Sequence, residues 1–133
     1  MATAHPLHRA IVAALNADAE VQTVFGDRIY DMPPKEPVTP WIRVGEILEV
    51  RELAECGKLY ECYVDIHVFT TQGKGLNWCR ECCAKVVQAL DDAPLDLVGA
   101  DMLEVLHRST RAFLVVDGRT GHGIVNFRAL TEI

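Results

Sequence analysis

Apolar residues near the start of the chain recur at the spacing of a helix. Four of them fall on one face of such a helix: Leu7, Ile11, Ala14 and Leu15. This pattern predicts an amphipathic helix over residues 6–17, which begins at Pro6 because proline suits the first helical turn. A second, shorter helix is predicted over residues 19–25, and Gly26 after it is a common helix stop.

Residues 31–40 carry no helical or strand pattern. They include four prolines: Pro33, Pro34, Pro37 and Pro40. Proline removes a backbone donor and disfavours both helix and central strand, so we expect an extended loop. Ten irregular residues are long for a connection, and this length indicates a role at the surface, such as contact with a partner.

The middle of the chain alternates between apolar and polar residues, as half-buried strands do. Residues 41–53 predict a long strand with one apolar face, made of Ile42, Val44, Leu48 and Val50. Residues 60–69 alternate strictly and predict its mate. A loop at residues 54–58, which contains Gly57, would join the two strands as an antiparallel hairpin.

A main helix is predicted after a break at residues 73–75. Its apolar stripe consists of Leu76, Cys79, Cys83, Val86, Val87 and Leu90, and Pro94 ends it. Two further strands, residues 102–116 and 123–131, flank a turn at residues 117–121. The order of elements predicts one α+β domain over residues 1–133. We expect a mostly antiparallel sheet of about four long strands, with an N-terminal helix and one main helix packed on it.

Composition narrows the class of protein. A chain of 133 residues that is 50% hydrophobic and 24% charged can bury one core without disulfides or a structural metal. No apolar run is long enough to cross a membrane, and the N-terminal residues lack the pattern of a secretory signal. A net charge of -6 argues against a protein that wraps nucleic acid. Five cysteines, an odd number, then indicate reduced thiols in a cytosol.

The W-C-x-x-C sequence at residues 78–82 resembles the active site of thioredoxin. In that fold the first cysteine begins a helix, which lowers the pKa of its thiol. Here Cys79 would lie about one turn inside the main helix, and the strands around it read as antiparallel. We therefore favour cysteines that pack the helix on the sheet, and a small thiol-dependent redox protein stays as the alternative.

A zinc site is a second interpretation of the cysteines. Its possible ligands are Cys56, Cys62, Cys79, Cys82, Cys83 and His67. Structural zinc sites offer two closely spaced ligand pairs, and only Cys79 with Cys82 has such spacing. In a strand, Cys62 and His67 face opposite sides of the sheet. The sequence predicts no metal and no cofactor.

Three residues of strand 60–69 could line one face for acid and base chemistry: Glu61, Asp65 and His67. A wet face, or one that meets a neighbouring subunit, is the favoured alternative because nothing else supplies a nucleophile or an oxyanion site. The single serine, Ser109, lies outside any nucleophile motif. Residues 118–123 are glycine-rich but lead into a strand, so they lack the helix N-terminus that binds phosphate. We therefore expect no catalytic residue and no enzyme.

Several local strings resemble a family of small phage proteins. These strings are ALNADA at residues 14–19, GDRIY at 26–30, PWIRV at 40–44 and YECYVDIHVF at 60–69. Together with the order of elements over residues 7–131, they resemble the tail completion or tail terminator proteins of tailed phages, prophages and gene transfer agents. The cysteine-rich main helix departs from this pattern.

The resemblance implies a structural protein of the virion. It implies a ring, usually of six copies, that caps the tail tube at the neck end and joins it to the head-side connector protein. DNA would pass through the lumen without specific binding, no membrane would be involved, and assembly would take place in the cytoplasm of the bacterial host. A chain of this length has a radius of gyration of roughly 14 Å, so six copies in a closed ring leave room for a duplex.

Three exposed segments are candidates for contacts in such a ring: residues 31–40, 51–58 and 117–123. The candidate residues are Pro33, Pro34, Lys35, Glu52, Glu55, Lys58, Asp117, Arg119, Thr120 and His122. An ordinary surface loop is the alternative for each segment.

Overall fold

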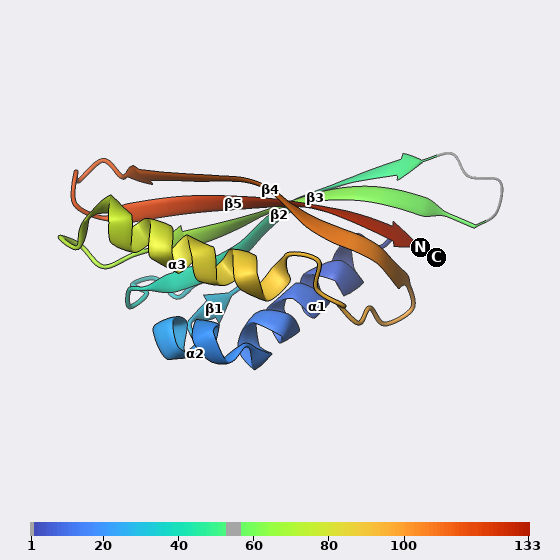
Figure 1. Cartoon of the computed structure of the whole chain (residues 1–133), viewed down its shortest axis with the longest axis horizontal. Helices are drawn as coiled ribbons and strands as arrows, with labels where there is room; N and C mark the ends of the chain where they lie inside the picture. Colours follow the sequence, from blue (N-terminus) through green and yellow to red (C-terminus); the bar gives the residue numbers. More distant parts are fainter. Residues whose placement is uncertain (1, 53–56) are drawn as a thin grey trace.

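Residues 2–52 and 57–133 are described by the computed structural model, in which one sheet carries helices on one face (Figure 1). The elements are α1 (Ala4–Ala17), α2 (Ala19–Phe25), β1 (Ile29–Tyr30), β2 (Trp41–Glu52), β3 (Leu59–Phe69), α3 (Gly75–Leu90), β4 (Asp101–Leu114) and β5 (Gly121–Glu132). The strand order is β1-β2-β3-β5-β4, and every pair is antiparallel except β1 with β2. The predicted α+β class with a mostly antiparallel sheet is confirmed.

Strand β1 is the element that the sequence pattern missed. It consists of two residues, and Ile29 pairs with Ile42 of β2 in parallel. Two residues are too few to show the alternation of apolar and polar side chains that predicts a strand. The expected loop at residues 31–40 follows it and contains neither helix nor strand. The predicted candidate Glu55 and the cysteine at position 56 lie outside the described residues.

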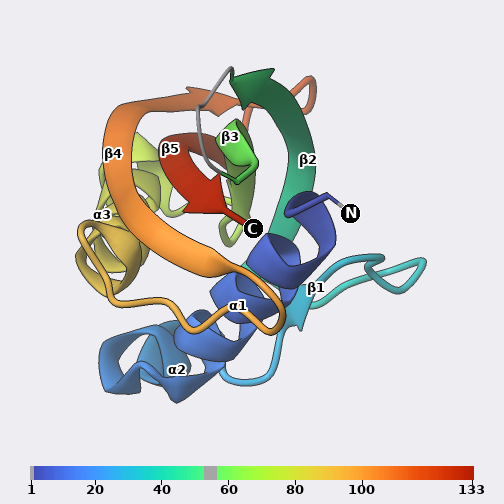
Figure 2. The same cartoon turned by 90° about the vertical axis from the view of Figure 1, so that its right-hand side faces the viewer.

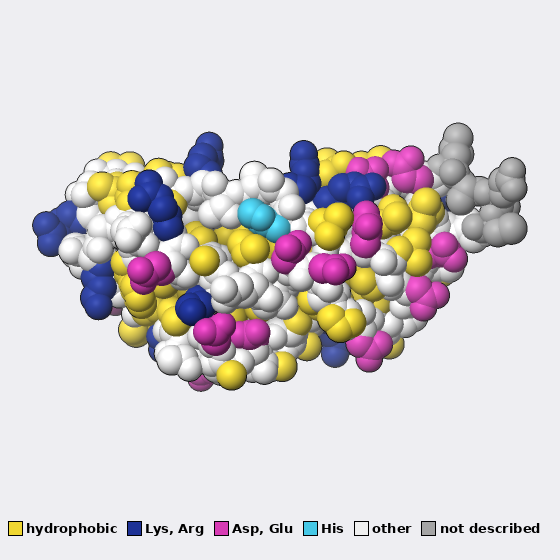
Figure 3. Space-filling view, viewed as in Figure 1, with side chains coloured by type: hydrophobic (Ala, Val, Ile, Leu, Met, Phe, Trp, Pro, Cys, Tyr) yellow, Lys and Arg dark blue, Asp and Glu magenta, His cyan; other side chains and the backbone are white. Residues whose placement is uncertain are grey.

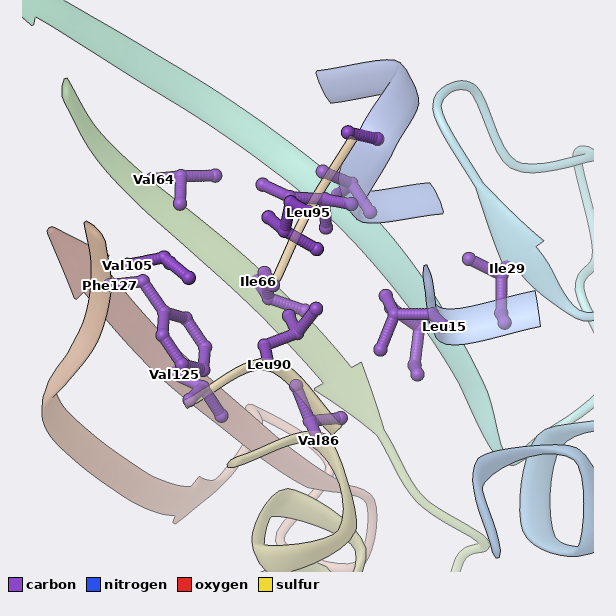
Figure 4. Close-up of a cluster of buried hydrophobic side chains, with 14 of the residues drawn as sticks. Leu15, Ile29, Val64, Ile66, Val86, Leu90, Leu95, Val105, Val125 and Phe127 are labelled. Carbon is purple, nitrogen blue, oxygen red and sulfur yellow. The ribbon is translucent and has the colours of Figure 1, made fainter. Parts of the chain in front are cut away.

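The core lies between the helices and the covered face of the sheet (Figure 4). Ile66 of β3 lies in the middle of this core beside Leu90 of α3, with Phe127 of β5 on one side and Leu15 of α1 on the other. In β3 and β5 every second residue is buried, because alternate side chains point to opposite faces. Within the described residues, no helix is long and apolar enough to cross a membrane.

A β-bulge in β2 corrects the predicted face of that strand. The pairing with β3 shifts between Val44 and Ile47, so the strand gains a residue and its alternation reverses. Ile42 and Val44 are buried as expected, but Leu48 and Val50 lie on the opposite face and are exposed. The prediction that all four share one face is therefore wrong.

Gly45 makes this bulge possible. A Cβ atom at this position would stand 2.8 Å from Cδ2 of His67 and 2.9 Å from the carbonyl oxygen of Asp65. Only glycine lets β2 come this close to β3. Two further shifts occur in β4, between Met102 and Glu104 and between His107 and Ser109. They accompany the strong bend of β4 that Figure 2 shows, as bulges do.

The N-terminus of α1 is fixed by a carboxylate from the sheet rather than by a local cap. The side chain of Thr3, the N-cap residue, makes no capping hydrogen bond. Instead the backbone N–H groups of Thr3 and Ala4 donate to Oε2 of Glu49 in β2, at 2.8 and 2.7 Å. A negative charge is stabilising at a helix N-terminus, so this contact ties α1 to the far part of β2.

Candidate assembly surface

The helices leave the second face of the sheet open (Figures 1 and 2). We call this surface the open face. Its residues from β3 are Leu59, Glu61, Tyr63, Asp65, His67 and Phe69, and those from β5 are His122, Ile124, Asn126, Arg128, Leu130 and Glu132. All of them are partly exposed. A face that mixes aromatic and charged side chains in this way resembles a protein contact surface more than a solvent-facing one.

An aromatic ladder crosses the open face from edge to edge. Each strand contributes one ring, in the order of the sheet: Tyr30, Trp41, Phe69, His122 and Phe113. The centroids of neighbouring rings are 6.1, 4.3, 4.2 and 4.8 Å apart along this row. The guanidinium of Arg111 lies 5.2 Å from the centroid of Phe113 and extends the row. Such pairs contribute about 0.5–1.5 kcal/mol each beyond the burial of their surface.

A shallow pocket lies beside the ladder. It has a volume of about 590 Å³ and is lined by Asp31, Met32, Pro33, Trp41, Arg43, His67, Phe69 and His122. Nδ1 of His67 and Nε2 of His122 lie 3.0 Å apart and share a hydrogen bond. Burial, followed by the nearby charges of His67 and Arg111, lowers the pKa of His122 to about 4. His122 is therefore neutral at neutral pH.

The middle of the open face holds a network of ion pairs. Arg128 donates from Nε to Oε1 of Glu61 at 2.8 Å and from Nη1 to Oε1 of Glu104 at 2.9 Å. The hydroxyl of Tyr63 also donates to Glu61, and the guanidinium of Arg108 lies 4.7 Å from the centroid of the Tyr63 ring. Hydrogen bonds from Tyr63 and Arg128 hold the pKa of the Glu61 carboxyl below its ordinary value.

The structure tests the prediction that Glu61, Asp65 and His67 line one face of the sheet. The three residues do share one face, as expected. Each of them, however, has its own partner on β5, since Asp65 accepts a hydrogen bond from Asn126 at 2.7 Å and His67 contacts His122. Their arrangement is that of structural cross-strand pairs.

The turn between β4 and β5 is held together by Asp117. Its Oδ1 accepts hydrogen bonds from the backbone N–H groups of Arg119 and Thr120, each at 2.8 Å, and its Oδ2 accepts one from the Thr120 hydroxyl at 2.6 Å. The Thr120 hydroxyl and these backbone groups hold the pKa of Asp117 well below its ordinary range. The predicted turn is thus an ordered tip. His122, which we expected in the same loop, instead lies in β5 within the ladder.

The candidate contact residues divide between the two ends of the sheet. The proline loop, the turn tip and the ladder lie at one end, where Met32 and Val38 are 86% and 67% exposed. Pro34 and Lys35 are exposed there too, whereas Pro33 is half-buried at the pocket. Glu52 and Lys58 lie at the other end, where β2 ends and β3 begins. The ladder was missed by sequence reasoning because it requires the pairing of five strands.

The cysteines that the structure describes lie in the core and not in an accessible site. The four that the structure describes are free and buried: Cys62, Cys79, Cys82 and Cys83. Cys79 and Cys83 pack against β5, where a Cβ atom at Gly123 would overlap the sulfur of Cys83. A hydrogen bond from Cys83 lowers the pKa of Cys79, and burial raises the pKa of Cys82 to about 12. Complete burial of Cys79 argues against thiol chemistry on an outside substrate.

Metal binding finds no support in the same region. In the part of the chain that the structure describes, no group of three or more His, Cys, Asp or Glu side chains is arranged to hold an ion. Cys62 is buried under the sheet, while His67 points to the open face, as their opposite parity predicted. The cysteine-rich helix packs by close approach to glycines of β5, which explains why small side chains occur there.

The open face and the ladder give this small α+β protein an exposed surface of the kind that protein contacts use. The profile of the family described as tail completion protein gp17 matches residues 9–132, and the chain belongs to this family of tail structural proteins. The resemblance inferred from the sequence is confirmed.

Comparison of structures agrees with this fold. A chain in a solved structure of the virion of a native gene transfer agent particle superposes with a TM-score of 0.90, over 98% of this chain and 98% of that one, at 23% identity. No curated protein sequence matches this chain significantly.

Proposed function

We propose that this protein completes the tail of a phage-type particle as a tail terminator. In this role, copies of the chain form a ring, of six in the expected case, on the neck end of the tail tube. The ring joins the tube to the connector protein of the head. The observation that carries the proposal is family membership over residues 9–132, in a chain whose fold also occurs in a gene transfer agent virion.

The open face supports this proposal physically. A protein that stays alone in water rarely shows a sheet face with exposed apolar residues such as Leu48, Val50 and Leu106 beside aromatic rings. Contact with other copies or with tube and connector proteins would remove this surface from water. The whole chain, residues 1–133, would act in the ring as one domain.

The charge of the protein suits a passage for DNA. Neutralisation of phosphates by lysine and arginine supplies the affinity of most DNA-binding proteins. This chain has 13 such residues against 19 acidic ones. A ring built from it would let the duplex pass without holding it. The tail of the particle, assembled in the host cytoplasm, is the expected location.

Purified protein and purified tail tubes test the proposal. Light scattering and electron microscopy should show a ring, either in solution or on one end of each tube, and tubes so capped should join heads. Protein that is a monomer at every concentration and leaves tube ends bare would contradict it.

A variant of the proline loop, residues 31–40, tests whether this segment contacts a partner. Met32→Asp with Val38→Asp places two charges where exposed apolar side chains now lie, and should reduce ring or tube binding. The matched control is Thr23→Asp with Gln88→Asp on the helical side of the molecule, which should leave binding unchanged. Equal binding by both variants would remove the loop from the contact surface.

A further inference from the structure

Charge is distributed unevenly between the two ends of the molecule. On the face that Figure 3 shows, Lys and Arg side chains are more frequent toward one end of the long axis, and Asp and Glu side chains are more frequent toward the other. The basic end is formed by the β4–β5 turn and the start of α3, with Lys74, Arg80, Arg111 and Arg119 exposed. Acidic residues also occur here: Asp117 is engaged in the turn, Glu81 follows Arg80 on α3, and Asp31 and Glu36 belong to the neighbouring proline loop. At the turn and the start of α3 the basic side chains outnumber the acidic ones.

The acidic end lies where β4 begins and where β2 and β5 finish. Its acidic residues are Glu52, Asp96, Asp101, Glu104 and Glu132, of which Glu104 is already paired with Arg128. Asp96 and Glu104 line one shallow pocket, so the loop after α3 belongs to this end. Arg51 and Lys58 also lie here, and the acidic side chains outnumber them. Among the described residues, no ion pair involves Asp96 or Asp101.

Both ends also expose apolar side chains. Val116 at the basic end is fully exposed, and Leu114 beside it is 42% exposed. Val98 and Leu103 at the acidic end are 84% and 51% exposed. Each end therefore combines an apolar patch with an excess of charges of one sign. This is the composition of a protein interface, in which apolar contact supplies affinity and charge selects the partner and its orientation.

The two ends are complementary to each other and not to themselves. If two basic ends met, like charges would face one another, which disfavours a two-fold symmetric contact through either end. A basic end against an acidic end pairs opposite charges. Because the two ends lie on opposite sides of one molecule, such a contact repeats from copy to copy and either closes a ring or grows a filament.

We propose that the partner of the basic end is the acidic end of a second copy of this chain. This inference rests on the self-association in the proposed function and specifies its contact: Arg111 and Arg119 of one copy lie near Asp96 and Asp101 of the next. The contact is heterologous, so each copy uses both ends in the assembled state.

Charge reversal at each end tests the contact. The basic-end variant is Arg111→Glu with Arg119→Glu, and the acidic-end variant is Asp96→Lys with Asp101→Lys. Each variant alone should raise the concentration at half assembly by about tenfold or more, because both ends of the contact then carry the same sign. A control on the helical side, Glu20→Lys with Asp27→Lys, changes the net charge as the acidic-end variant does and should assemble as the wild type does.

Mixing the two variants gives the decisive result. An equimolar mixture should assemble again, since the reversed end of each variant now fits an end of the other, and native mass spectrometry should find equal numbers of both. A chain that carries all four substitutions should assemble by itself. Circular dichroism on every variant shows that a loss of assembly is not a loss of folding.

Three results would overturn the proposal: single-end variants that assemble like the wild type, a mixture of folded variants that does not assemble, or assemblies of the mixture that stop at dimers. A wild-type chain that is monomeric both free and on tail tubes would overturn it together with the ring. If copies do assemble through these ends but the product neither caps tubes nor joins heads, the proposed function fails and this contact stands.

Discussion

The carboxylate of Glu49 should be among the largest single contributors to stability outside the core. It accepts hydrogen bonds from the backbone N–H groups of Thr3 and Ala4, and one at 3.3 Å from the hydroxyl of Thr3. Thr3 is completely buried and also accepts a hydrogen bond from the hydroxyl of Thr131 at 2.7 Å. After Glu49→Ala, the buried N–H group of Thr3 would have no acceptor and little access to water.

The size of the loss follows from these contacts. A hydrogen bond to a charged group contributes about 1.5–3 kcal/mol, and a carboxylate at a helix N-terminus adds roughly 0.3–1 kcal/mol. Because the bonds share one oxygen, they are not additive, and we expect Glu49→Ala to reduce the free energy of unfolding by about 3 kcal/mol. The same loss lowers the melting temperature of a domain of this size by about 10 °C. Glu49→Gln keeps an acceptor oxygen and should cost only about 1 kcal/mol.

Urea unfolding followed by circular dichroism at a protein concentration below that of assembly measures these values. Glu36→Ala, an exposed residue of the proline loop, changes the net charge equally and should leave the unfolding free energy within about 0.5 kcal/mol of the wild type. If Glu49→Ala also stays within this range, or if Glu49→Gln loses as much as Glu49→Ala, the account of the cap is incorrect.

Four further experiments test other parts of the structure. Gly45→Ala forces a Cβ atom against His67 and should lower the unfolding free energy by about 1–3 kcal/mol in urea titrations. Stability should fall as pH drops from about 6.5 toward about 4, because His122 takes up a proton more readily unfolded than folded, and His122→Phe should flatten this part of the pH profile. Removal of the neighbouring imidazole by His67→Asn should raise the pKa of His122 in NMR titrations. In native protein Cys79 and Cys83 should resist maleimide, with the label located by mass spectrometry, and should react once urea unfolds the chain.

Local patterns were sufficient for the elements that carry a strong period. The apolar spacing of α1 and α3 and the strict alternation of β3 each reflect one buried face, so sequence alone predicts them. The prediction for the second half of β2 was wrong because the bulge adds one residue and so reverses which side chains face the core. Gly45 was a signal of this, since an isolated glycine in a strand often marks a bulge or a close approach of backbones.

Contacts between distant segments could not be predicted in the same way. To predict the ladder, one must know the register of β5 against both β3 and β4, because His122 of β5 contacts a ring from each of these strands. Glu49 is 46 residues from Thr3, and its alternating neighbours give no sign that it caps a helix. The face shared by Glu61 and His67 followed from parity, but their partners on β5 did not.

The pairing of charges also decides which parts of the open face are available to a partner. In its middle, Arg128 already holds Glu61 and Glu104, and Asp65 already binds Asn126. A partner that covered this region would have to desolvate ions that gain little from a new contact. At the two ends, an excess of exposed charges of one sign stands beside exposed apolar side chains, so a contact there would remove apolar surface from water and pair charges at once. The proposed contact between copies therefore fits the ends of the sheet better than its centre.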